Sequence, residues 1–128
     1  MPLGQMRNFV KELSVVRQKM DELNYRPVTI EDIVAGAEVI MVDVLRFSVY
    51  GRSMEKFGQA GTTVIKLLDP PTRVHKLLHE TTMVYYTCVG TNENVEIFVP
   101  MEEFLRDGYT PKGNYSSDTR YFVKKEVA

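Results

Sequence analysis

The sequence predicts an α+β domain in which a long N-terminal helix accompanies an antiparallel sheet of about five strands, with short helical inserts. Two observations predict this class. Apolar residues near the N-terminus recur at alternating spacings of three and four, the period of an amphipathic helix. The rest of the chain has short runs of β-branched and aromatic residues separated by glycine, proline and asparagine, which is typical of strands and turns. Because short strands with frequent glycines curl readily, a partly closed, barrel-like sheet is also consistent with this pattern.

Length and composition indicate an ordinary globular protein. A chain of 128 residues suits a single domain, 1–128, with the helix at about 5–24 and the β-rich body at about 37–128. The net charge is −1, so no basic excess favours nucleic acid as a partner. Cys88 is the one cysteine and cannot form an internal disulfide, and the first residues show no signal-peptide pattern. We therefore expect a cytoplasmic protein without a membrane span.

The N-terminal helix carries a narrow apolar stripe at the a and d positions of a heptad repeat. These positions, called here the N-terminal stripe, hold Met6, Phe9, Leu13, Val16, Met20 and Leu23. Glu12 and Arg17 have the offset at which two parallel helices exchange a charge pair. The register lasts only about two and a half heptads, which is short for a free coiled coil. Two interpretations stay open: the stripe packs on the protein's own sheet, or it pairs with a second copy and makes a homo-oligomer.

The next segments predict a linker helix and a hairpin. Thr29 to Asp32 has the pattern of a capping box, and Gly36 is placed to end a helix of one or two turns. The apolar residues of 38–50 predict a strand long enough to be buried on both faces. A loop with glycines at 51, 58 and 61 then leads to a second strand at 62–68, which suggests a hairpin with a long tip.

A further helix is predicted to start at Asp69, because aspartate caps free amides and the prolines that follow suit a first helical turn. It should run to about Glu80. This helix would place His75 and His79 on one side, four residues apart, as two possible metal ligands. The pair lacks the order of a metalloprotease motif and a third ligand. We therefore expect no metal or other cofactor, and two histidines at the water boundary.

The C-terminal part predicts more β-structure. Segments 83–89 and 95–99 flank the polar residues 90–94, a pattern typical of a hairpin. A short helix is expected from Pro100 to Arg106, and a last strand at 120–125. The stretch 109–122 interleaves tyrosines with cations, which suits stacking on nucleotides or contact with a protein. We favour a plainer interpretation, in which lysines of the last strand protect an exposed sheet edge.

The candidate ligand site is the glycine-containing loop and its surroundings. Guanidinium groups, a hydroxyl and free backbone amides there could hold a phosphate or carboxylate, while Tyr50 or Phe57 stacks on a ring. The candidate ligand-binding residues are Arg46, Tyr50, Arg52, Lys56 and Arg120, with Ser53 as the hydroxyl. None of the glycines falls in a P-loop or dinucleotide-binding order.

Two functions are consistent with these residues. We favour a non-enzymatic cytoplasmic binding or regulatory protein that self-associates through its N-terminal helix and binds a small anionic or nucleotide-like ligand or a protein partner. The alternative is a small enzyme that acts on a phosphate-bearing substrate with His75 or His79 as acid, base or metal ligand. No serine lies in a nucleophile elbow, and Cys88 lies in mid-strand, where its pKa is not lowered.

Overall fold

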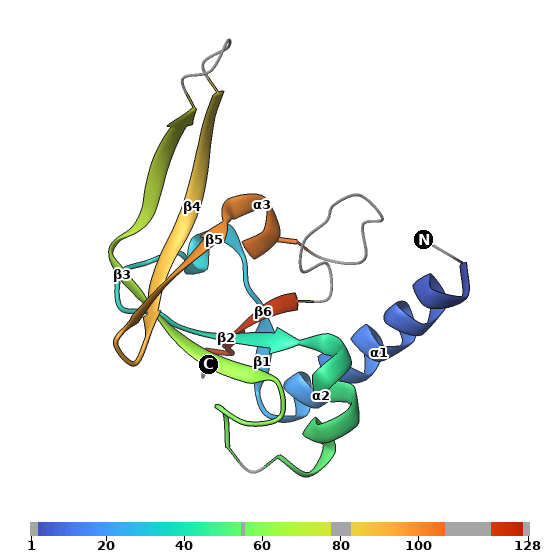
Figure 1. The fold of residues 1–128 in the computed structure, drawn as a ribbon. Coiled ribbons are helices and arrows are strands. Elements are labelled where there is room, and N and C mark those ends of the chain that lie inside the picture. Colours follow the sequence, from blue (N-terminus) through green and yellow to red (C-terminus); the bar gives the residue numbers. More distant parts are fainter. Residues whose placement is uncertain (1–2, 55, 78–82, 107–118, 127–128) are drawn as a thin grey trace.

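The computed structural model describes residues 3–54, 56–77, 83–106 and 119–126. In this part of the chain, six antiparallel strands form one sheet in the order β1-β6-β2-β3-β4-β5, with helices on both faces (Figure 1). The elements are α1 (Leu3–Glu22), β1 (Tyr25–Pro27), η1 (Ile30–Asp32), β2 (Glu38–Asp43), α2 (Val44–Tyr50), η2 (Gly51–Ser53), β3 (Thr62–Leu77), β4 (Met83–Asn92), β5 (Val95–Pro100), α3 (Met101–Phe104) and β6 (Thr119–Lys124).

The α+β class is confirmed, with differences in detail. The sheet is open, with β1 and β5 at its two edges, so it is not the partly closed barrel with which the glycines were also consistent. The added strand, β1, was missed because it has three residues and ends in a proline. The helix α1 has 20 residues, or about 30 Å, whereas the 16 residues of β3 extend over about 50 Å. The longest element is therefore a strand, and the description of a long helix does not hold.

The C-terminal half of α1 packs on the protein's own sheet. Leu13, Val16 and Met20 of the N-terminal stripe are buried in an apolar cluster with side chains from β2, α2 and β6, including Ile40 and Phe122. We call it the first apolar cluster. Leu23 is half-buried at the end of the stripe. The side chains of Met6 and Phe9 lie outside the described residues, so pairing of that end with a second copy stays a prediction.

The opposite face of the sheet carries a second apolar cluster. It joins Val39, Ile65, Cys88 and Tyr121 from the strands to Phe104 of α3, among others. Strand β2 contributes to both clusters, because Val39 and Ile40 point to opposite faces. Its continuous apolar run thus matches the expectation of a strand buried on both sides.

The chain turns into a helix where the first strand was expected to continue. The side chain of Asp43 accepts a hydrogen bond of 3.1 Å from the backbone N–H of Arg46 and so caps α2. Val44 and Phe47 are buried while Leu45 and Val49 are exposed, which is helical spacing rather than strand alternation. The expected strand over 38–50 therefore ends at Asp43.

The helix expected to start at Asp69 is wrong, because β3 continues to Leu77. Its second half pairs with β4 from Thr72 opposite Cys88 to Leu77 opposite Met83, and the register shifts between Leu67 and Thr72. The two prolines lie in this shift, where the ladder is interrupted and their missing N–H groups cost nothing. The same residues that suit a helix start thus suit a break in a strand.

The second half of β3 and the first half of β4 form a two-stranded ribbon that extends beyond β5 (Figure 1). His75 lies on this ribbon, and His79 lies outside the described residues. His75 therefore does not lie on the helix on which the metal interpretation depended. The adjoining hairpin of β4 and β5 is confirmed with a tighter turn than expected, since Asn92 pairs directly with Val95.

Two C-terminal expectations have different outcomes. The short helix is present as α3, with Pro100 at its N-cap. The last strand is present as β6, but it lies between β1 and β2 inside the sheet. Its lysines therefore do not protect an exposed edge, and that interpretation is wrong.

The expected linker helix is the single turn η1, and its cap is joined to an ion pair. Asp32 accepts hydrogen bonds from the backbone and hydroxyl of Thr29, which completes the capping box. Both carboxylate oxygens also accept from the guanidinium of Arg26 at 2.7 Å. This bidentate pair connects strand β1 to η1 and lowers the pKa of Asp32 to about 2, the bond to Arg26 being the largest cause.

Replacing Asp32 with asparagine should lower the free energy of unfolding at pH 7 by about 1–2 kcal/mol, because the pair that lowers the pKa of Asp32 is lost. The partial exposure of both side chains keeps the loss this small. The folded-state pKa lies below the ordinary 3.8, so this stability is present above about pH 4 and is lost as the pH falls through about 2. Urea unfolding of both proteins at pH 7 and pH 2 checks this. The neighbouring variant Glu31→Gln, at an exposed residue, is the control, and equal losses in the two variants would contradict the role of the pair.

Candidate functional site

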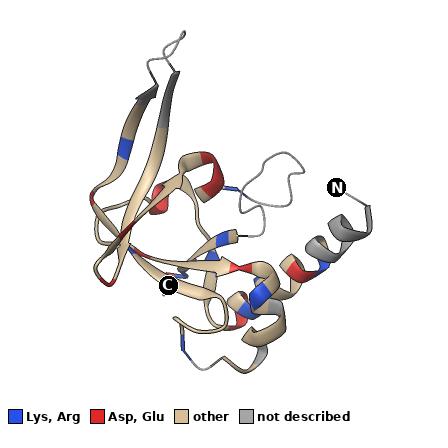
Figure 2. Ribbon diagram, viewed as in Figure 1, with Lys and Arg blue, Asp and Glu red and all other residues tan. Residues whose placement is uncertain are grey.

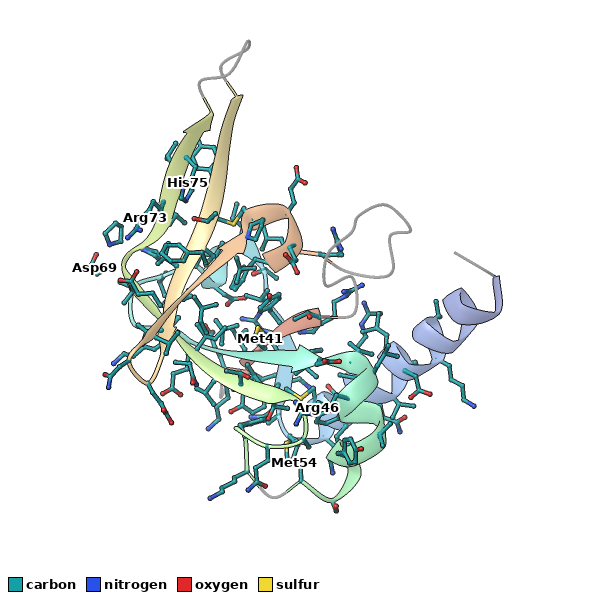
Figure 3. The ribbon with its side chains drawn as sticks, in the orientation of Figure 1. Met41, Arg46, Met54, Asp69, Arg73 and His75 are labelled. Carbon is teal, nitrogen blue, oxygen red and sulfur yellow. The ribbon has the colours of Figure 1, made fainter. Side chains whose placement is uncertain are left out.

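A hollow of about 510 Å³ lies beside α2, on the face of the sheet covered by α1 and α2. It is lined by Arg46, Tyr50, Ser53, Met54, Gln59 and Ala60. One wall is α2 and η2, and the other is the segment that leads into β3. Figure 3 shows Arg46 and Met54 at this end of the molecule.

The helix α2 places the two residues of this wall that suit an anionic ligand. Arg46 and Tyr50 are four residues apart and therefore lie on the same side of the helix. Tyr50 is 65% exposed, so its ring is available to a ligand. Gly51 follows directly and packs on the ring of Phe47, where a Cβ would lie 2.6 Å from the ring. The chain can thus turn sharply after α2 and return along the hollow.

The opposite wall is a fixed turn. The hydroxyl of Thr62 accepts from the backbone N–H of Gly58 at 3.0 Å and donates to the carbonyl of Gln59 at 2.6 Å. Gly61 has φ +82, and a Cβ there would lie 3.1 Å from the Cβ of Arg46. This close approach holds the turn against α2. The tip of the expected hairpin thus supplies one wall of the hollow.

Phe57 has a structural role in the same segment. Its ring meets that of Tyr25 edge to face, with centroids 4.9 Å apart. It packs against the first apolar cluster and does not line the hollow. Of the two rings suggested for stacking on a ligand, only Tyr50 lies at the hollow.

The structure brings together some of the ligand-binding residues expected from the sequence. Arg46 and Tyr50 line the hollow, as does Ser53. Lys56 is exposed on the same loop but outside the lining, and the side chain of Arg52 lies outside the described residues. Arg120 is 3% exposed within β6, where it donates a 2.7 Å bond to the carbonyl of Thr119. It does not line the hollow.

Met54, Gln59 and Ala60 complete the lining and were missed by sequence reasoning. The only local signal was the position of Gln59 and Ala60 between Gly58 and Gly61. Their inward placement depends on the hydrogen bonds of Thr62, which a residue pattern does not display.

His75 does not belong to this site. Its Nε2 lies 3.0 Å from the hydroxyl oxygen of Thr87 on the ribbon, and Figure 3 shows it far from Arg46. Arg73 is nearby, 5.1 Å above the ring of Phe98. The geometry therefore gives no support to an enzyme that uses His75 beside the arginines of the loop.

Cys88 is an apolar core residue. It is 1% exposed in the second apolar cluster, and burial raises its pKa to about 11. The thiol is therefore protonated at neutral pH and unsuited to nucleophilic chemistry. This agrees with its expected place in mid-strand.

Charges of both signs are mixed over the described elements, with no continuous stripe of one sign (Figure 2). Within the described ranges, no cluster of three or more histidine, cysteine and carboxylate side chains has the arrangement of a metal site. Of the helices in the described residues, none combines the length and the apolar character that crossing a membrane requires.

Comparisons with protein-family models, with curated proteins and with solved structures found no match to this chain.

Proposed function

We propose that this protein is a non-enzymatic binding protein whose ligand is a small anion with an attached ring, such as a nucleotide. The observation that carries the proposal is the placement of Arg46 and Tyr50 one turn apart at a hollow of about 510 Å³. This volume lies within the range of roughly 300–1,000 Å³ that is usual for small-molecule sites.

The chemistry of the lining supports an anion with a ring. A guanidinium group offers two parallel donors that match a phosphate or carboxylate. A tyrosine ring on the same side can pack on a flat apolar group. Ser53 and Gln59 add a hydroxyl and an amide on the approach to the turn.

Replacing Arg46 with alanine should weaken nucleotide binding about 10- to 100-fold, because a hydrogen-bonded charge partner is lost. The fold should be unaffected, since the cap of α2 uses the backbone N–H of residue 46 and not its side chain. Calorimetry with the four common nucleoside monophosphates measures this directly. The control is Arg73→Ala, which removes the same charge on the ribbon and should bind as the unmodified protein does. Equal affinity in Arg46→Ala, or no binding of any of the four at millimolar concentration, would refute the proposal.

A protein partner is the second candidate, favoured by the outer side of α2. Val49 and Leu45 are both exposed there, next to Tyr50. Apolar groups gathered on a surface helix are typical of contact sites between proteins. The variant Val49→Asp separates the two proposals, because it should leave nucleotide binding intact while disrupting a protein contact.

A further inference from the structure

A second hollow, also of about 510 Å³, lies on the face of the sheet opposite α1 and α2. It is lined by Pro27, Val28, Thr29, Ile30, Leu105, Arg106 and Tyr121. One wall is the segment from β1 to η1, the floor comes from β6, and the other wall is the chain directly after α3. It shares no lining residue with the hollow beside α2.

The walls of this hollow are mainly apolar and fixed. Val28 and Tyr121 belong to the second apolar cluster, and the N–H of Val28 donates a 3.0 Å bond to the carbonyl of Tyr121. Ile30 is 65% exposed at the rim, so its apolar side chain is accessible to a ligand in the hollow. The guanidinium of Arg26, on β1, already donates hydrogen bonds to both carboxylate oxygens of Asp32.

Among the described residues that line this hollow, Arg106 is the one that carries a charge. Its Nη1 atom is inaccessible to solvent and has no hydrogen-bond partner in the part of the chain that the structure describes. A buried donor of a charged group without an acceptor is unfavourable. Because Arg106 lines the hollow, a rotation of its guanidinium would bring this donor to an anion there, which would supply the acceptor. The backbone of Arg106 is held by a 3.2 Å bond from its N–H to the carbonyl of Glu103, which fixes the base of the side chain.

We propose that this hollow binds a small monocarboxylate with an apolar body, the carboxylate on Arg106 and the body against Val28, Ile30 and Leu105. The phenol of Tyr121 stays neutral beside it, since burial and, to a lesser degree, the charge of Glu103 raise its pKa. That neighbouring carboxylate also opposes a second negative charge on the ligand. A single charge on an apolar molecule therefore suits the site better than a phosphate does.

The test compares 3-phenylpropionate, hexanoate and decanoate with the uncharged 3-phenylpropanamide, by ligand-detected NMR and calorimetry. We expect at least one acid to bind, and 3-phenylpropanamide to bind at least 10-fold more weakly than 3-phenylpropionate. In Arg106→Gln, affinity for the acid should fall about 10- to 100-fold, the loss expected for a hydrogen bond to a charged group. Arg106→Met, which keeps an apolar stem, should behave in the same way.

Two controls make the result specific. Arg73→Gln removes an equal charge on the ribbon, and Arg46→Ala disables the other hollow, so both should bind the acid as the unmodified protein does. Retained acid binding in Arg46→Ala also separates this proposal from the nucleotide proposal. Equal affinity for acid and amide, unchanged acid binding in Arg106→Gln, or no binding of any acid at millimolar concentration would overturn it.

Discussion

Replacing Gly90 with alanine is expected to lower the free energy of unfolding by about 2–3 kcal/mol, the usual effect of an added methyl group in a packed core. A Cβ at this position would lie 2.3 Å from the Cγ2 of Ile65 and 3.0 Å from the carbonyl oxygen of Lys66. The strand cannot move aside, because Gly90 pairs with Leu67 on one side and Ile97 on the other. Urea unfolding followed by circular dichroism measures the loss.

A double-mutant cycle tests the cause of this effect. Ile65→Ala removes the Cγ2 atom that an alanine at 90 would meet. In that background the cost of Gly90→Ala should fall by about 1 kcal/mol or more, since contacting residues are not additive. The carbonyl of Lys66 remains close, so some cost should persist. Strictly additive losses would show that the clash with Ile65 is not responsible.

Gly90 also illustrates what the sequence leaves open. Its position next to polar residues predicts the start of a hairpin loop, although β4 continues to Asn92. Its actual role is to allow close approach of Ile65 from the neighbouring strand. That requirement arises from a contact between distant parts of the chain, which a local pattern does not contain.

Elements with local determinants were predicted well. The capping box before η1 and the proline before α3 act within a few residues, and both elements lie where expected. The segments that failed depend on pairing or on a competing local signal. The prolines at 70 and 71 suit a helix start, but pairing with β4 keeps this segment in a strand. For α2, the cap by Asp43 was the missed signal.

The candidate sites also combine residues that the local sequence indicates with residues that only the fold brings together. Arg46 and Tyr50 were recognisable as a cation and a ring near glycines, even though the expected strand is a helix. The remaining lining needs the turn fixed by Thr62. The hollow at Arg106 joins segments that are far apart in sequence, so no spacing or motif could have indicated it.

Replacing Val16 with aspartate should have the largest effect, a loss of about 4 kcal/mol or more that leaves the domain largely unfolded. Val16 is 0% exposed and packs in the first apolar cluster with Ile40 and Phe122, among others. A carboxylate there would be buried without a partner, which is among the most costly substitutions. Circular dichroism and the urea midpoint measure the effect. The control is Ser14→Asp, an exposed position on the same helix, where a change within about 0.5 kcal/mol is expected.

The same variant separates the two interpretations of the N-terminal stripe. If Leu13, Val16 and Met20 stabilise the domain from within, Val16→Asp unfolds it whatever the protein concentration. If they served mainly to pair two copies, the variant would stay folded and only its mass in solution would fall. Native mass spectrometry beside the unfolding curve distinguishes these results. A folded Val16→Asp protein with unchanged stability would contradict the packing of α1 on its own sheet, because no buried position of that cluster could accept a charge without cost.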